Sequence, residues 1–71
     1  MRYTSEQFER ARAALLDSEQ RLVRQRRRVE KLTLDRQPAE QAQALLKVME
    51  ETVLSMKRYL EILEKDLGAG I

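Results

Sequence analysis

The chain has 71 residues, contains neither cysteine nor histidine, and carries a net charge of +2 with 37% charged and 42% hydrophobic residues. These values predict one domain, residues 1–71, and exclude disulfides, histidine-based metal sites and the usual general base of an enzyme. Because so short a chain buries only a small core when it folds alone, the composition favours stabilisation by a second subunit.

The first predicted element is a helix over about 4–33. Thr4 and Gln7 are spaced as the two members of a capping box, and Tyr3 and Phe8 are spaced as a hydrophobic staple. No glycine or proline follows before residue 33. The pattern therefore predicts one long helix with a well-defined start.

A turn and a second helix over about 38–67 follow. Pro38 suits the first position of a helix, where its missing N–H costs nothing, and it disfavours helical geometry at Gln37. Gly68 comes directly after the last apolar residue of the repeat and is predicted to form a left-handed cap.

Each predicted helix carries an apolar seam whose members alternate steps of three and four, as in a coiled coil. If the turn is centred between Asp35 and Arg36, facing residues have numbers that add up to about 71, and seam then meets seam in every layer. The sequence therefore predicts an all-α fold, an antiparallel two-helix hairpin. The seams are Phe8, Ala11, Leu15, Ser18, Leu22, Gln25, Val29 and Leu32 in the first helix, and Ala42, Leu46, Met49, Val53, Met56, Leu60, Leu63 and Leu67 in the second.

The second helix carries a further line of mainly apolar residues beside its seam, which we name the apolar stripe. On a helical wheel this line lies roughly 100° from the seam, so one partner helix cannot cover both. An uncovered line of this kind is typical of an interface. We therefore expect two hairpins to dimerise into a four-helix bundle, with their relative orientation left open. The expected dimer interface is Leu45, Val48, Thr52, Ser55, Tyr59 and Ile62.

A second conspicuous feature is a line of cations in the first helix, which we name the basic stripe. It consists of Arg21, Arg24, Arg28 and Lys31. Arginine neutralises phosphates, so the stripe is a candidate contact for RNA or DNA. The favoured interpretation is that the whole arginine run at residues 24–28, with Arg21 and Lys31 beside it, is a solvated edge. Its stems would cover the apolar margin and its charges would pair with Glu50 and Glu51, because no aromatic residue is interleaved with the cations.

The remaining candidates carry less chemistry. Met49 and Met56 lie on the seam and are expected to fill the core rather than bind a soft metal. Glu61, Glu64 and Asp66 are expected to be a solvated helix end rather than a cation site. Ser18 and Gln25 are polar seam residues that either fix the register or reach water where the helices splay. Leu16, Val23 and Leu54 have no place in the predicted packing.

Three segments follow a recurrent pattern. The run EQRLVRQ at residues 19–25 is followed by Ala44-Leu45-Leu46 and then by Glu50-Glu51-Thr52-Val53-Leu54. With these segments the chain resembles small uncharacterised helical-hairpin proteins of alphaproteobacteria. The resemblance covers about two thirds of the chain and implies a hairpin in a bacterial protein, with no activity attached to it.

The sequence predicts a non-enzymatic homodimeric helical-bundle scaffold or protein-interaction module, with no catalytic residue, metal or cofactor. The alternative is a small RNA- or DNA-binding regulator that uses the basic stripe. The first residues have no apolar signal core, and no apolar run approaches the ~20 residues that span a bilayer. The expected location is therefore cytoplasmic, with the chain itself as the first partner, a second protein as a further one, and no membrane.

Overall fold

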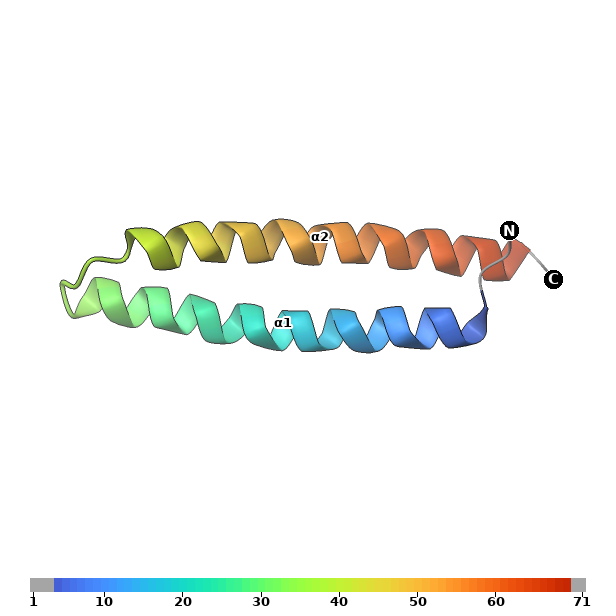
Figure 1. The fold of residues 1–71 in the computed structure, drawn as a ribbon, viewed down its shortest axis with the longest axis horizontal. Coiled ribbons are helices and arrows are strands. Elements are labelled where there is room, and N and C mark those ends of the chain that lie inside the picture. Colours follow the sequence, from blue (N-terminus) through green and yellow to red (C-terminus); the bar gives the residue numbers. More distant parts are fainter. Residues whose placement is uncertain (1–3, 70–71) are drawn as a thin grey trace.

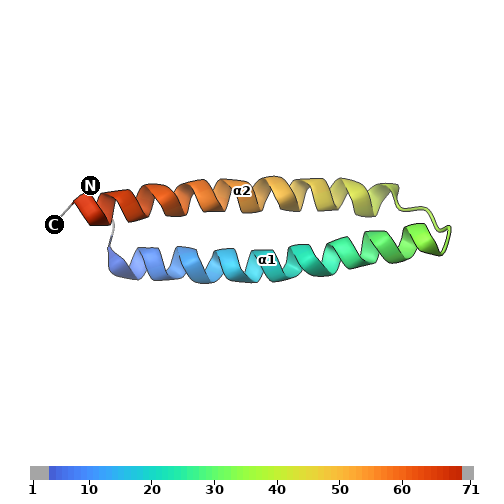
Figure 2. The same cartoon turned by 180° about the vertical axis from the view of Figure 1, so that it is seen from behind.

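The computed structural model describes residues 4–69, which form two long helices, α1 (Ser5–Leu34) and α2 (Glu40–Ala69). The helices run antiparallel and lie side by side, joined at one end by a short loop (Figure 1). In the view from behind, the described residues form the same two helices with no further layer over them (Figure 2). The predicted hairpin is confirmed, and each helix end lies within two residues of its predicted position.

The start of α1 is held by the predicted capping box. The Thr4 backbone N–H donates to Oε1 of Gln7 at 2.8 Å, and the Gln7 N–H donates to Oγ1 of Thr4 at 3.1 Å. Two donors that a helix start leaves unpaired are thereby satisfied. Tyr3, the first member of the expected staple, lies outside the described residues.

The end of α1 is closed by a left-handed residue that is not glycine. Arg36 has φ of +56°, its N–H donates to the Thr33 carbonyl at 3.2 Å, and the Gln37 N–H donates to the Leu32 carbonyl at 2.8 Å. This pair of bonds is the Schellman motif. The left-handed residue turns the chain away from α1, and residues 37–39 carry it across to the second axis. Pro38 therefore lies in the loop and not at the first helical position, so that prediction was wrong.

Replacing Arg36 with glycine is expected to stabilise the hairpin by about 0.5–1 kcal/mol, since glycine adopts positive φ without the Cβ clash. The measurement is urea unfolding followed by circular dichroism. Asp35→Gly is the control, because Asp35 has φ of −81° and gains nothing from glycine. An Arg36→Gly variant that unfolds at lower urea than the parent chain would contradict the role given to the left-handed cap.

The end of α2 also corrects the prediction. The helix continues through Gly68 to Ala69, and no glycine among the described residues has positive φ. The expected left-handed cap at Gly68 was therefore wrong. Two neighbours favour continuation, because Ala69 is a strong helix former and Leu67 is still partly buried.

The core of the hairpin is the line where the two predicted seams meet. Every residue of both seams is buried or partly buried. The most deeply buried apolar residues are Leu15, Leu22, Val53 and Leu63, with Leu63 fully covered. Leu15, Leu22 and Val53 form one cluster, and the residues packed against it are Leu46, Met49, Met56 and Leu60. Both seam methionines therefore serve as core residues, as predicted.

Two contacts between the helices report the register. Gln25 is 9% exposed, and its Nε2 donates to the Ala42 carbonyl at 2.9 Å. This amide therefore joins the helices instead of reaching water. Arg26 pairs with Glu50 at 3.5 Å. Ala42 lies about one turn before the residue that the predicted register places opposite Gln25, and Glu50 lies about one turn after the residue that it places opposite Arg26. The two contacts therefore lie on either side of the predicted register.

Candidate self-association surface

The apolar stripe of α2 is not covered by α1. Its four large side chains, Leu45, Val48, Tyr59 and Ile62, are 51%, 57%, 44% and 55% exposed, and Thr52 and Ser55 between them are also exposed. The seam of the same helix, by contrast, consists of residues that are all buried or partly buried. The hairpin therefore buries one of the two apolar lines of α2 and leaves the other in water.

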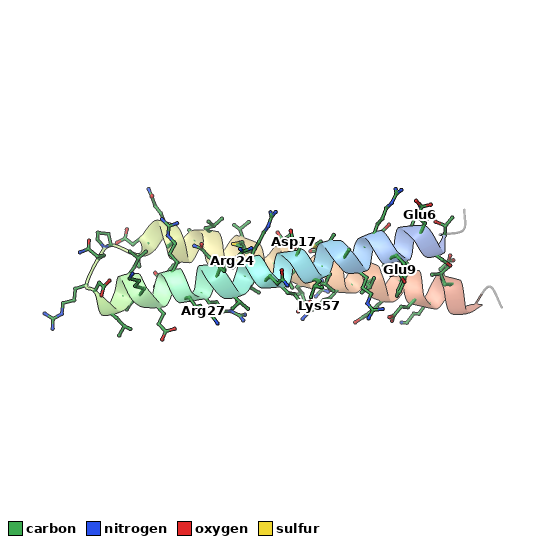
Figure 3. The ribbon with its side chains drawn as sticks, turned by 90° about the horizontal axis from the view of Figure 1, so that it is seen from below. Glu6, Glu9, Asp17, Arg24, Arg27 and Lys57 are labelled. Carbon is green, nitrogen blue, oxygen red and sulfur yellow. The ribbon has the colours of Figure 1, made fainter. Side chains whose placement is uncertain are left out.

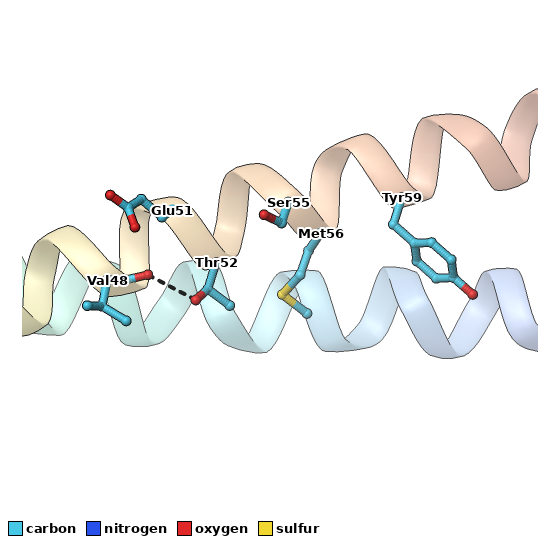
Figure 4. Close-up of a pocket in the computed structure, with 6 residues that line it drawn as sticks. All are labelled: Val48, Glu51, Thr52, Ser55, Met56 and Tyr59. Atoms are coloured by element: carbon cyan, nitrogen blue, oxygen red, sulfur yellow. Dashed lines mark hydrogen bonds between the residues drawn. The ribbon is translucent and has the colours of Figure 1, made fainter.

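The middle of the stripe is a shallow hollow. Its walls are Val48, Glu51, Thr52, Ser55, Met56 and Tyr59 (Figure 4). The Thr52 hydroxyl donates to the Val48 carbonyl at 2.9 Å, four residues earlier in the same helix. Because this hydroxyl is already paired, another apolar surface can cover it without leaving a buried donor unsatisfied.

The accessible surface of the chain is larger than that of a typical folded monomer of the same mass. Its accessible area is 6061 Å², whereas the scaling for folded monomers gives about 4600 Å² at a mass of 8.4 kDa. The excess arises because the molecule is a rod of 55 × 15 × 13 Å in which each helix has a single neighbour. This excess of about 1400 Å² is larger than the ~800 Å² that each partner buries in a standard protein interface.

The basic stripe of α1 lies on the same face of the hairpin as the apolar stripe. Arg21 and Thr52 line one small hollow between the helices, and Arg28 and Leu45 line another. Arg24 and Arg27 lie in the half of α1 that is nearer to the turn, whereas Glu6 and Glu9 lie near its start (Figure 3). The face is thus apolar along α2 and cationic along the half of α1 that is nearer to the turn.

The charges of the basic stripe are paired differently from the sequence prediction. Arg21 pairs with Asp17 of its own helix at 3.1 Å, while the ion pair to Glu50 is made by Arg26, outside the stripe. Within residues 4–69, no ion pair joins the other three cations of the stripe to a carboxylate; these are Arg24, Arg28 and Lys31. The expected pairing of the arginine run with carboxylates of α2 is therefore confirmed for Arg26 with Glu50, while among the described residues no cation of the basic stripe pairs with Glu50 or Glu51.

The three apolar residues that the sequence scheme did not place are exposed. Leu16 is 60%, Val23 43% and Leu54 50% exposed. Leu54 shares a hollow with Arg26 and Lys57, and Leu16 shares one with Leu60. Arg26 and Arg21 lie on opposite sides of the α1 seam, so Leu54 lies on the face of the hairpin opposite the apolar stripe.

Between residues 4 and 69 no group of three or more histidine, cysteine, aspartate or glutamate side chains is placed to hold a metal ion, and this includes Glu61, Glu64 and Asp66. Over the same residues neither helix is long and apolar enough to cross a membrane.

Comparison of the chain with models of protein families, with curated proteins and with solved structures finds no match. The resemblance to alphaproteobacterial helical-hairpin proteins therefore stays a prediction. The face that carries the apolar stripe and the basic stripe is therefore the candidate functional surface.

Proposed function

We propose that this protein is a non-enzymatic, homodimeric helical bundle that acts as a cytoplasmic scaffold or protein-interaction module. Two hairpins pack through the apolar stripe of α2 and form a four-helix bundle. The observation that carries the proposal is the contrast within α2, where the seam is covered and the four large residues of the stripe are 44–57% exposed.

The energetics favour covering the stripe. Full burial of a large apolar side chain contributes about 1.5–3 kcal/mol, and each of the four is only about half buried in the hairpin. A single hairpin is expected to have a small free energy of unfolding, because its core contains only four buried apolar residues among those described. The second copy buries its own stripe in the same interface. The free energy gained by the dimer is therefore twice the contribution of one stripe.

Sedimentation equilibrium of the intact chain at about 10 μM tests the proposal. We expect a mass twice the 8.4 kDa of one chain, together with a helical circular dichroism spectrum. The mass of one chain with an undiminished helical signal would overturn the dimer, because it would show that the hairpin is stable with its stripe in water. Unfolding midpoints that rise with protein concentration are the second expected sign of dimerisation.

A second candidate function is favoured by one observation. Arg24, Arg28 and Lys31 are exposed, and none of them has an ion-pair partner among the described residues. Three unpaired cations along one helix edge suit the phosphates of RNA or DNA. Affinity for a nucleic acid that falls steeply as salt is added would support this function, and absence of binding at low salt would reject it.

A further inference from the structure

The apolar stripe of α2 is symmetric in the size of its side chains. Leu45 and Val48 are large and apolar at one end, Tyr59 and Ile62 are large at the other, and the two small hydroxyl residues lie in the middle. The steps between successive members are three, four, three, four and three, which read the same in both directions. The midpoint of the stripe falls between residues 53 and 54.

We propose that the second copy lies antiparallel to the first, with α2 packed on α2 and a two-fold axis at this midpoint. Thr52 of each copy then faces Ser55 of the other. The outer pairs are Val48 with Tyr59 and Leu45 with Ile62. The inference rests on the proposed dimer and adds its orientation and register, so that the partner of this surface is a second copy in one defined pose.

The residues at the axis suit this pose. A two-fold axis brings the same surface of both copies together, so its centre must be complementary to itself. Thr52 and Ser55 are small and let the two helix backbones approach, while the larger pairs lie farther out. The Thr52 hydroxyl is bonded to the Val48 carbonyl at 2.9 Å, and Ser55 has the same option with the carbonyl four residues before it.

The charges argue against the parallel pose. If the two turns lay at the same end of the bundle, the basic stripes of both copies would lie at that end and repel each other. The large apolar residues of α2 would also face the partner's α1, whose edge on this face holds Arg21, Arg24 and Arg28. The antiparallel pose places the two basic stripes toward opposite ends and lets apolar stripe meet apolar stripe.

The register is fixed by the same residues. A slip of one heptad toward the turn would place Tyr59 opposite Gln41 and Ile62 opposite Pro38, both outside the stripe. Leu45 and Val48 would then face only the small residues Ser55 and Thr52. All four large side chains of each copy would therefore lose their large apolar partners, and with them part of the free energy gained by burying their exposed halves. The unslipped register is the one that covers all four.

Spin labels measure the orientation directly. Because the chain has no native cysteine, Ala44→Cys and Lys65→Cys each give a single label at an exposed position. For the antiparallel pose, the rise of 1.5 Å per residue gives axial separations of about 28 Å between two labels at 44 and about 35 Å between two at 65. A mixture of the two labelled variants gives a new distance below about 20 Å in pulsed electron paramagnetic resonance.

The possible outcomes separate the two proposals. A parallel dimer gives the inverse result, short distances within each variant and about 30 Å in the mixture, and would overturn the orientation while leaving the dimer intact. Any dimer in which the mixed pair is not the shortest also overturns it. Absence of every intermolecular distance would overturn the proposed dimer itself. Circular dichroism and sedimentation of the labelled variants, compared with the parent chain, verify that labelling leaves fold and association unchanged.

Discussion

Replacing Leu45 with glutamine is expected to weaken self-association about 100-fold, measured as the dissociation constant of the dimer by sedimentation. Leu45 is 51% exposed in the hairpin, so most of the loss falls on the dimer and not on the fold. Each dimer loses two leucines from its interface, and a loss of about 1.4 kcal/mol from each corresponds to that factor. Glutamine keeps the size and helix propensity of leucine, so the change tests apolarity alone.

Leu54→Gln is the matched control. Leu54 is 50% exposed on the same helix but lies on the opposite face of the hairpin. Its replacement is expected to leave the dissociation constant within a factor of about three, as for surface changes away from an interface. Equal weakening by both variants would show that the proposed face is not the one that binds, and no weakening by either would exclude both faces.

Replacing Leu63 with alanine is expected to lower the free energy of unfolding by about 2–5 kcal/mol. Leu63 is 0% exposed, the most deeply buried side chain of the hairpin, so its removal leaves a cavity in addition to the lost apolar burial. In a molecule of this size such a loss takes away much of the total stability. Urea unfolding at several fixed protein concentrations measures it and separates the fold from dimerisation.

Leu54→Ala serves as the comparison for this variant, since it removes the same atoms from a side chain that is half exposed. Its cost is expected to be below about 1 kcal/mol. If the two alanine variants unfolded at the same urea concentration, Leu63 would not be the centre of packing that its burial indicates. A Leu63 variant that is unfolded without urea would agree with the upper end of the expected range.

The helices, their pairing and their register were predictable because they depend on periodicity. Steps of three and four put Leu15, Leu22 and Val53 on one line of each helix, and only that line can be covered by one neighbour. The capping box was predictable for a similar reason, because Thr4 and Gln7 satisfy each other locally. Features that depend on a repeat or on neighbours in sequence can therefore be predicted from the sequence alone.

The turn and the C-terminal end were not predictable in the same way. Arg36 adopts positive φ in place of glycine because the geometry that joins two packed helices requires it, and the pairing of the helices outweighs a local cost of about 1–2 kcal/mol. Gly68, the glycine that local rules select as a cap, stays in the helix. At the turn the pairing of α1 with α2 decides the backbone, whereas at Gly68 the helix simply continues to Ala69.

The candidate surface was predictable in composition but not in its surroundings. Periodicity identifies the stripe from Leu45 to Ile62, and the structure shows that its large side chains are exposed. That the basic stripe borders the same face follows from the antiparallel pairing, which places Arg21 near Thr52 and Arg28 near Leu45. Arg26, and not the stripe, pairs with Glu50 because these two residues lie on the same side of the hairpin, opposite the basic stripe.

The single short loop also imposes an order on folding. The bond from Gln25 to Ala42 links residues 17 apart, whereas Phe8 and Leu63 lie on the seams near the open end and are separated by most of the chain. Closing the longer loop costs about 1 kcal/mol more in chain entropy unless the shorter one has formed first. We therefore expect the helices to associate from the turn outward, and thermal opening to begin at the end that holds Thr4 and Ala69.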